Sequence, residues 1–366
     1  MGAADAFEAQ VAAASLAAAE GRWEAAAEQW GRAAAMARGR GAHGSAARCA
    51  EQEGECWRRA DHAERAERAL SQALAEPEPP ADPVATVARL AAVLGERGEG
   101  RRALAVGRQA RHMARRAGHG SLPLALDTLV GLLQGYGSKE EQRPLVDALE
   151  ASLGPAPSVT FRRGQLLRLD GRLGEADAAF AAVEEGLDGV PGAEAGVAAA
   201  RMERAEIGML EGRTAGAVDA FAAARRLHEQ AGRASLAWRC EVGRVRACVR
   251  VGLEPVAPGL DAARAWACAR GLALLAVDLR VARGLCDLRR RPDAAREVLL
   301  VAAAEAESMG CALRAGRAYL HLLHHVPAEE ADRRRWGAKA IEGLRDNLPL
   351  RQEAAAAVER IGGSCP

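Results

Sequence analysis

Apolar and polar residues recur along the chain with the period of an α-helix, and three stretches repeat the same order of residues. Each stretch opens with Gly-Arg, carries an alanine five residues after the glycine, and then places an aromatic and a small apolar residue at helical spacing. The three stretches are 21–33, 171–183 and 212–224. Residues three and four positions apart lie on one face of a helix. The pattern therefore predicts amphipathic helices that begin after Gly-containing turns.

The alanine of this pattern marks a repeat that extends along most of the chain. Markers occur at Ala26, Ala66, Ala103, Ala176 and Ala217, followed by weaker candidates at Ala257, Ala295 and Ala331. Their mean spacing is about 38 residues once the long interval before Ala176 is counted as two periods. That interval predicts a degenerate unit at 121–153, with a helix at 122–134, a break at 135–138 and a second helix that opens near Pro144, a residue favoured in a first helical turn.

The repeat predicts an all-α fold, a solenoid of tandem antiparallel helical hairpins. About nine hairpins would fill residues 1–342, and 343–366 would hold a short capping helix that begins at Leu348, followed by a tail. The proline-rich segments 76–83 and 154–157 are expected as joints between hairpins, because proline interrupts helices. Glycine at each break permits φ > 0, the marker alanine lets two helices approach closely, and the aromatic residue fills the gap between units.

Composition agrees with a helical array and excludes several classes of partner. Hydrophobic residues make up 49% of the chain but aromatics only 3%, so the core must consist of Ala, Leu and Val at close helix–helix spacing. The 50 basic and 49 acidic residues leave a formal charge of +1, without the positive excess that non-specific phosphate binding requires. No apolar run approaches the roughly 18 residues of a membrane-spanning helix. Neither nucleic acid nor a membrane is therefore the expected partner.

The N-terminus and the cysteines indicate a reduced cytoplasmic setting. No basic segment precedes the Ala-rich run of the first 20 residues, as it would in a secretory signal. The eight cysteines lack the C-x-x-C pairs of zinc or redox sites. Most of them fall within apolar helical pattern, and the pairs Cys49/Cys56 and Cys240/Cys248 are expected to be buried packing residues.

At the level of its G-x-Φ-x-x-A-x-x-x-Φ-x-x-A pattern, the chain resembles the tetratricopeptide repeat family. The match is sharpest at 7–37, 157–186 and 198–227. The resemblance implies a right-handed superhelix whose concave face, lined by the first helix of each unit, holds a peptide or a partner helix. The long repeat is similar to those of bacterial regulators and kinase-associated sensor arms. The family's common peptide clamp uses asparagines, and here the chain has only Asn347, so a folded or helical partner is expected instead.

Candidate chemistry is sparse. His321 and His325 lie four residues apart on a predicted helix, a spacing that can present two imidazoles to a metal, but further ligands are missing nearby, and a solvated or partly buried histidine cluster is the favoured interpretation. The runs 289–291 and 333–335 are arginine triplets, for which solvated turns are favoured over phosphate sites. Trp238 and Trp266 are expected as packing residues rather than as a platform for bases.

No nucleotide-binding, zinc-protease or serine-hydrolase motif occurs. We therefore predict a non-catalytic scaffold without cofactor or metal, which binds a cytoplasmic protein or helical peptide through its concave face in bacterial signalling or complex assembly. Alternatives are a ligand- or partner-sensing arm of a kinase or transcription-factor system and, with less support, an RNA-binding helical repeat. Self-association is left open. The predicted partner-binding residues lie on two first helices; they are Phe161, Arg162, Gln165, Arg168, Met202, Glu203, Glu206 and Met209.

Overall fold

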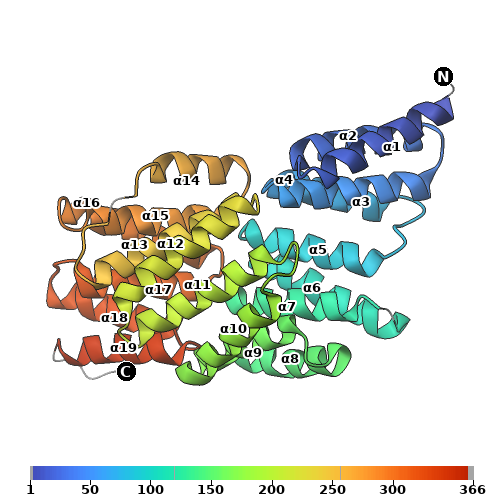
Figure 1. Cartoon of the computed structure of the whole chain (residues 1–366). Coiled ribbons are helices and arrows are strands. Elements are labelled where there is room, and N and C mark those ends of the chain that lie inside the picture. The colour runs from blue at the N-terminus through green and yellow to red at the C-terminus, as the bar shows by residue number, and fades with distance from the viewer. Residues whose placement is uncertain (1–2, 119, 256, 362–366) are drawn as a thin grey trace. The chain divides into compact units, whose positions relative to one another are not determined.

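A computed structural model of the chain describes residues 3–118, 120–255 and 257–361. These residues form 19 helices in tandem and, within those ranges, no strand (Figure 1). The helices fall into two compact units: unit 1 comprises residues 1–132 and 269–272, and unit 2 comprises residues 133–268 and 273–366. The all-α solenoid of helical hairpins predicted from the repeat is thereby confirmed.

Unit 1 holds the helices of the first three hairpins and most of the helix that follows. Their bounds are α1 Ala3–Ala19, α2 Trp23–Gly39, α3 His43–Arg59, α4 Ala63–Ala75, α5 Pro83–Glu96, α6 Gly100–Ala117 and α7 Leu122–Tyr136. Unit 2 holds the remaining helices. They are α8 Lys139–Leu153, α9 Pro157–Leu169, α10 Leu173–Leu187, α11 Glu194–Leu210, α12 Thr214–Gln230, α13 Ala234–Arg250, α14 Leu260–Ala269, α15 Ala273–Asp287, α16 Pro292–Ser308, α17 Ala312–His325, α18 Glu330–Gly343 and α19 Leu348–Glu359.

The marker alanine has a constant place, the fourth residue of the second helix in a hairpin. Ala26 in α2, Ala176 in α10 and Ala295 in α16 all occupy it and are fully buried. Two of the weaker markers are wrong. Ala257 lies in the loop before α14, where Ala263 takes the buried place, and Ala331 is exposed near the start of α18. Both errors follow from extrapolating the spacing, because loops of variable length shift the start of each second helix.

Glycines serve the fold at two kinds of position. At the hairpin turns, Gly21, Gly171 and Gly212 have φ values of 72°, 77° and 81°, the left-handed conformation predicted for them. Inside helices, glycines make room for large neighbours. A Cβ on Gly164 of α9 would lie 2.9 Å from the ring of Phe180, which is fully buried in α10. The aromatic residue of the repeat therefore fills its gap only because the facing helix carries no side chain there.

The degenerate unit is helical, but its second helix starts earlier than predicted. Helix α8 begins at Lys139 and contains Pro144 in its interior, so the prediction that the helix opens near Pro144 was wrong. Ser138 is the N-cap, and its hydroxyl accepts a hydrogen bond from the amide of Glu141 at 3.3 Å. Ser-x-x-Glu is the sequence of a capping box, a stronger start signal than a proline. The short final helix α19 is present as predicted, and the buried Asn347 is its N-cap.

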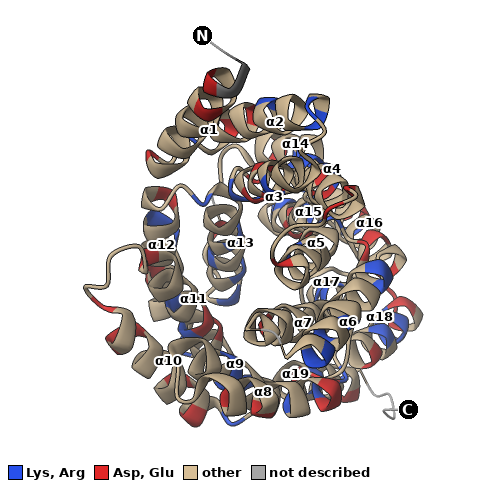
Figure 2. Ribbon diagram, turned by 90° about the vertical axis from the view of Figure 1, so that its right-hand side faces the viewer, with Lys and Arg blue, Asp and Glu red and all other residues tan. Residues whose placement is uncertain are grey.

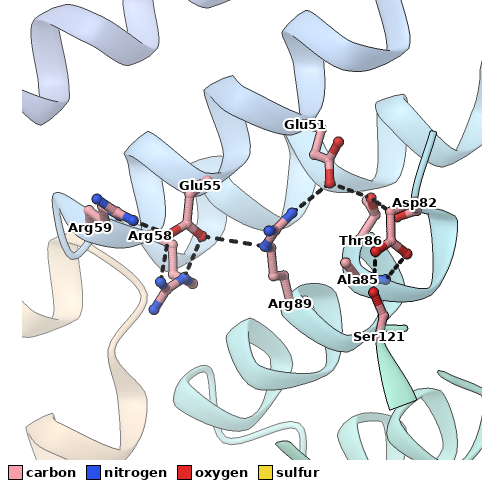
Figure 3. A network of polar contacts seen from close by, with 9 residues as sticks. All are labelled: Glu51, Glu55, Arg58, Arg59, Asp82, Ala85, Thr86, Arg89 and Ser121. Atoms are coloured by element: carbon pink, nitrogen blue, oxygen red, sulfur yellow. Dashed lines mark hydrogen bonds and ion pairs between the residues drawn. The ribbon is translucent and has the colours of Figure 1, made fainter. Parts of the chain in front are cut away.

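Polar contacts join successive first helices within unit 1 (Figure 3). Glu51 of α3 accepts hydrogen bonds from Thr86 at 2.9 Å and from Arg89 at 2.5 Å, both on α5. Glu55, one turn further along α3, pairs with Arg58 at 2.7 Å and lies 3.8 Å from Arg89. Glu51 and Arg89 are 38 residues apart, one repeat length. The repeat thus places charges of opposite sign at equivalent positions of neighbouring hairpins.

The division into two units falls within α7, between Leu132 and Leu133. The predicted boundaries at 342/343 and the joints at 76–83 and 154–157 stay predictions. Among the described residues, no helix is both long enough and apolar enough to cross a membrane.

Candidate partner-binding site

The eight residues predicted to contact a partner lie on α9 and α11 of unit 2, but they differ in exposure. Four of them are buried: Gln165, Arg168, Glu203 and Met209. The other four, Phe161, Arg162, Met202 and Glu206, are half-buried. The helical pattern placed all eight on the expected helices, yet half of them reach solvent only slightly. Their binding role stays a prediction.

The buried polar members of this set bind one another across the two repeats. The amide of Gln165 on α9 donates to the carboxylate of Glu203 on α11 at 2.7 Å. Arg168, which is 8% exposed, pairs with the same carboxylate through Nε at 2.9 Å. Gln134, near the end of α7, donates in turn to Gln165. A buried charge is tolerated only when it is paired, and Arg168 and Glu203 neutralise each other where the fold has removed them from water. Nε and Nη1 of Arg168 and Oε2 of Glu203 nevertheless have no hydrogen-bond partner among the described residues.

Glu206 on α11 is the centre of a second cluster. Its two arginine partners lie on other helices. Arg246 on α13 donates to its carboxylate through both terminal nitrogens, at 2.6 and 3.2 Å. Arg317 on α17 lies 3.6 Å from the same group. Burial alone would raise the pKa of Glu206, but Arg246 and Arg317 lower it to about 2. Burial, and then the charge of Arg246, lowers the pKa of Arg317 to about 10.

Two further clusters connect the first helices of unit 2. Asp278 on α15 accepts from Arg314 on α17 at 2.9 Å, one repeat apart. Glu353 on α19 pairs with Arg250 on α13 and lies 3.2 Å from Nε2 of His324 on α17. Burial would raise the pKa of Glu353, but His324 and Arg250 lower it to about 2. Helices α9, α11, α13, α15, α17 and α19 thus share an internal polar network, and Figure 2 shows the basic and acidic positions along them. We call it the inner network of unit 2.

Beside the inner network, three predicted residues keep accessible atoms. Phe161 packs edge-on against Phe180 at 5.3 Å between ring centroids. The guanidinium of Arg162 lies 5.9 Å from the centre of the Phe161 ring and donates to Gln165 at 3.1 Å. Met202 precedes the buried Glu203 on α11. An aromatic ring, a thioether and a guanidinium therefore border the link between Gln165 and Glu203.

The histidine cluster lies on α17. The rings of His321 and His325 stack with centroids 5.9 Å apart, and His321 is buried. Burial, followed by the charges of Arg246 and His325, lowers the pKa of His321 well below its usual value. Among the described residues, no three His, Cys, Asp or Glu side chains gather in a way that could hold a metal ion. The partly buried histidine cluster favoured from the sequence is what α17 contains.

The arginine triplets form ion pairs within the fold, and the four cysteines predicted as packing residues are buried. Arg290 pairs with Glu254 at 2.5 Å and Arg291 with Asp287 at 2.7 Å, around the turn before α16. The turn expected at the second triplet is wrong, because residues 333–335 lie within α18, where Arg334 pairs with Glu330. The four cysteines predicted as packing residues are buried, as expected. Burial raises the pKa of the Cys56 thiol to about 11 and that of Cys240 to about 12.

Sequence reasoning missed the partners of the inner network. Arg246 and Arg314 could have been found, because they follow Glu206 by 40 residues and Asp278 by 36, close to one repeat length. Arg250 and Glu353, 103 residues apart, carry no such signal. Their pairing depends on how closely α19 approaches α13, which the repeat length alone does not determine.

The tandem hairpins, the constant place of the marker alanine and the Gly-containing turns define a tetratricopeptide-like helical-repeat fold. No protein-family model matches the chain, and no curated protein matches it in sequence. Among solved structures, a tetratricopeptide repeat protein from Parabacteroides merdae is 18% identical, covering 72% of this chain and 93% of that one, with a TM-score of 0.39. A Rap protein complexed with competence and sporulation factor is 17% identical, covering 75% and 77%, with a TM-score of 0.45. The P58(IPK) TPR domain is 11% identical over 97% of both chains, with a TM-score of 0.26.

Proposed function

We propose that the chain is a non-catalytic scaffold that binds a protein or helical-peptide partner, and that α9 and α11 of unit 2 carry the contact surface. The observation that supports this most is the half-exposed group of Phe161, Arg162 and Met202 beside the inner network. Aromatic residues, methionine and arginine are enriched in the cores of protein interfaces. Their neighbours Gln165 and Glu203 are engaged with each other and hold this surface in place.

The proposal narrows the role of the predicted residues. Phe161, Arg162 and Met202 would contact the partner directly, and Glu206 would do so through its remaining exposed atoms. Gln165, Arg168, Glu203 and Met209 would position the two helices without touching the partner, because their side chains are buried. A cytoplasmic location and a part in bacterial signalling or complex assembly are further elements of the proposal.

A matched pair of charge reversals tests this surface. Arg162→Glu reverses a charge at the proposed contact, whereas Arg163→Glu does so one residue away, where the side chain is 49% exposed and pairs with Glu150. Each protein is used to capture partners from a native cell extract, and bound proteins are quantified by mass spectrometry. We expect Arg162→Glu to reduce the specifically captured protein at least about tenfold, because an interfacial charge reversal costs more than 1.4 kcal/mol.

Circular dichroism of both variants shows whether helicity is retained. If Arg162→Glu captures as much partner as the unmodified protein, or if Arg163→Glu is equally impaired, the surface is misplaced. An extract that yields no partner at all for the folded unmodified protein argues against the scaffold function itself.

A further inference from the structure

Unit 2 contains a cavity of about 180 Å³ that is separate from the surface on α9 and α11. It opens where the end of α13, the loop after it, the end of α15 and the last residue of α17 meet. Six apolar or weakly polar side chains form its wall. They are Val249, Leu253, Pro255, Leu285, Cys286 and Leu288. A dry cavity of about 150 Å³ lined by apolar side chains is large enough to hold benzene, so this one has room for a small organic molecule.

These six side chains form an apolar part of the wall at physiological pH. Burial raises the pKa of the Cys286 thiol to about 11, so the thiol stays protonated and behaves as a small hydrophobic group. Leu285 is almost fully buried, whereas Leu253 is 56% exposed. An exposed leucine of this kind at the edge of a cavity is an apolar surface that a ligand can cover.

Three polar side chains also line the cavity, Glu254, Arg289 and His325. The hydrogen-bonding capacity of Arg289 and His325 is largely unused. Arg289 donates through Nη2 to the carbonyl oxygen of Gly252. Among the described residues, no carboxylate pairs with Arg289, whereas its neighbours Arg290 and Arg291 are paired with Glu254 and Asp287. The charge of Glu254, which also lines the cavity, is thus already balanced by Arg290. Arg289 remains as the cation available to an anionic ligand.

His325 is the other polar lining residue with unused hydrogen-bonding capacity. Its ring contacts those of His321 and His324, and within the described part of the chain it makes no hydrogen bond. Burial, followed by the charges of His324 and Arg250, lowers its pKa to about 4. The imidazole is therefore neutral at pH 7, with one N–H donor and one acceptor nitrogen. A neutral donor in an apolar cavity fixes the orientation of a ligand without introducing a second charge.

We propose that this cavity is a binding site for a small monocarboxylic acid with an apolar body about the size of a benzene ring. The body packs against Val249, Leu285 and Cys286 and covers the exposed Leu253. The carboxylate pairs with the Arg289 guanidinium, which is suited to two parallel hydrogen bonds. The N–H of His325 donates a further hydrogen bond to the same ligand. The site is independent of the partner surface and adds small-molecule recognition to the scaffold.

Benzoate and its neutral analogue benzyl alcohol are suitable probes. Binding to the full chain is followed by ligand-observed NMR and by chemical-shift changes of residues on α13, α15 and α17. We expect benzoate to bind with a dissociation constant at or below about 1 mM, a modest affinity for so small a ligand. Arg289→Ala should weaken benzoate binding at least about tenfold and leave benzyl alcohol almost unchanged, because only the carboxylate uses the guanidinium.

Two further variants make the test decisive. Arg291→Ala removes the same charge two residues away, at a side chain that does not line the cavity, and should leave both probes unaffected. Cys286→Phe fills the cavity and should abolish binding of both probes, and a thermal melt verifies that it is folded. The proposal is overturned if no binding of benzoate is seen up to about 10 mM, a dissociation constant that corresponds to a binding free energy of less than about 3 kcal/mol. It is also overturned if Arg289→Ala and Arg291→Ala weaken benzoate binding equally.

Discussion

The two units use the same repeat but hold their first helices together differently. In unit 1, the network of Figure 3 joins residues of one helix or of elements one repeat apart, as Glu51 does with Arg89. In unit 2, the carboxylate of Glu206 on α11 is shared by Arg246 on the next first helix and by Arg317, two first helices further on. Unit 1 also has a contact between distant segments, because Arg270 pairs with Glu24 at 3.0 Å. Its first helices, however, are joined in Figure 3 by contacts between neighbours, whereas those of unit 2 are also joined by contacts between distant repeats.

This difference matters because each repeat of a solenoid normally contacts only its neighbours. Long-range ion pairs couple repeats that the nearest-neighbour packing leaves independent. They also place several charges where water is scarce, so that each one needs its partner. We therefore expect unit 2 to unfold more cooperatively than unit 1 and to respond more strongly to loss of a single polar group.

The largest expected effect is at the shared carboxylate. Glu206→Ala leaves Arg246 and Arg317 without their common partner, and unpaired buried charges of this kind destabilise a protein by about 3–5 kcal/mol. The counterpart in unit 1, Glu51→Ala, should cost about 1–2 kcal/mol, because Arg89 can still reach Glu55 or water. Hydrogen exchange followed by mass spectrometry measures both units separately. Adding Arg317→Met to Glu206→Ala should restore part of the loss, and equal effects of Glu206→Ala and Glu51→Ala would contradict the comparison.

Mild acid should also affect unit 2 more than unit 1. Burial, followed by the charges of Arg233 and Arg239, lowers the pKa of His228 to about 4, and in the described structure both of its buried ring nitrogens lack a hydrogen-bond partner. Between pH 6.5 and 4 the unfolded chain takes up a proton that the folded chain does not, so stability falls as the pH decreases. At pH 5 this amounts to about 2 kcal/mol for His228 alone.

His321 and His325, whose pKa values are also lowered, add to the same trend in unit 2. Urea denaturation of the unmodified protein and of His228→Leu, each at pH 7.5 and pH 5, measures the contribution of His228. The variant should lose less stability on acidification. If the two proteins show the same dependence on pH, the buried neutral histidine is not its source.

Helix-internal glycines should give the next effect. Gly243→Ala in unit 2 forces a methyl group against the ring of Phe221, and Gly54→Ala in unit 1 places one 2.6 Å from the side chain of Leu70. Overpacking costs about 1–3 kcal/mol, offset by up to about 1 kcal/mol of helix propensity. Gly216→Ala is the control, since nothing lies within 4 Å of the added Cβ, and should stabilise slightly. The rigid ring of Phe221 should yield less to the added methyl group than the flexible side chain of Leu70, so Gly243→Ala should lose more stability. A larger loss of stability for Gly54→Ala in denaturant titrations would contradict this order.

The smallest expected effects are at the helix caps. Ser138→Ala removes the N-cap of α8, and Asp82→Ala removes that of α5, whose carboxylate accepts from the amide of Ala85 at 2.9 Å. Each should cost about 1 kcal/mol. Asp82 should matter more because it also accepts from Ser121. Thermal melts of the two variants test this, with Ser158→Ala, an exposed serine near the start of α9, as a substitution expected to be neutral.

Most of the architecture could be predicted because it depends on local sequence patterns. Helical spacing, turn glycines and the marker alanine predicted the tandem hairpins, and Phe180 and Phe221 are buried as the repeat implied. The errors arose where a local signal was misread. Pro144 lies inside α8 and does not start it, because Ser138 and Glu141 form the stronger capping signal. Ala257 and Ala331 were placed by spacing, which variable loops displace.

The candidate site was less predictable, since the exposure of a side chain depends on which residues of other helices face it. Helical pattern located Arg168 and Glu203 on the correct helices, and it indicated one face for both. It could not reveal that the two side chains pair with each other in the interior instead of reaching solvent. The cavity beside His325 was equally hidden, because its lining comes from three separate segments of unit 2, at 249–255, 285–289 and 325.

The sequence by itself determined the near-neutral mixture of charges, which is set by composition. It also determined the helices and their pairing into hairpins, because these follow from contacts within about one repeat length. Only the tertiary structure decided which charges face each other across non-adjacent repeats. It also decided that Arg162 is half-buried whereas Arg168, six residues later on the same helix, is buried. Small changes in the angle between successive hairpins accumulate along a solenoid. Distances between repeats that are far apart therefore depend on every intervening contact, and no local pattern contains them.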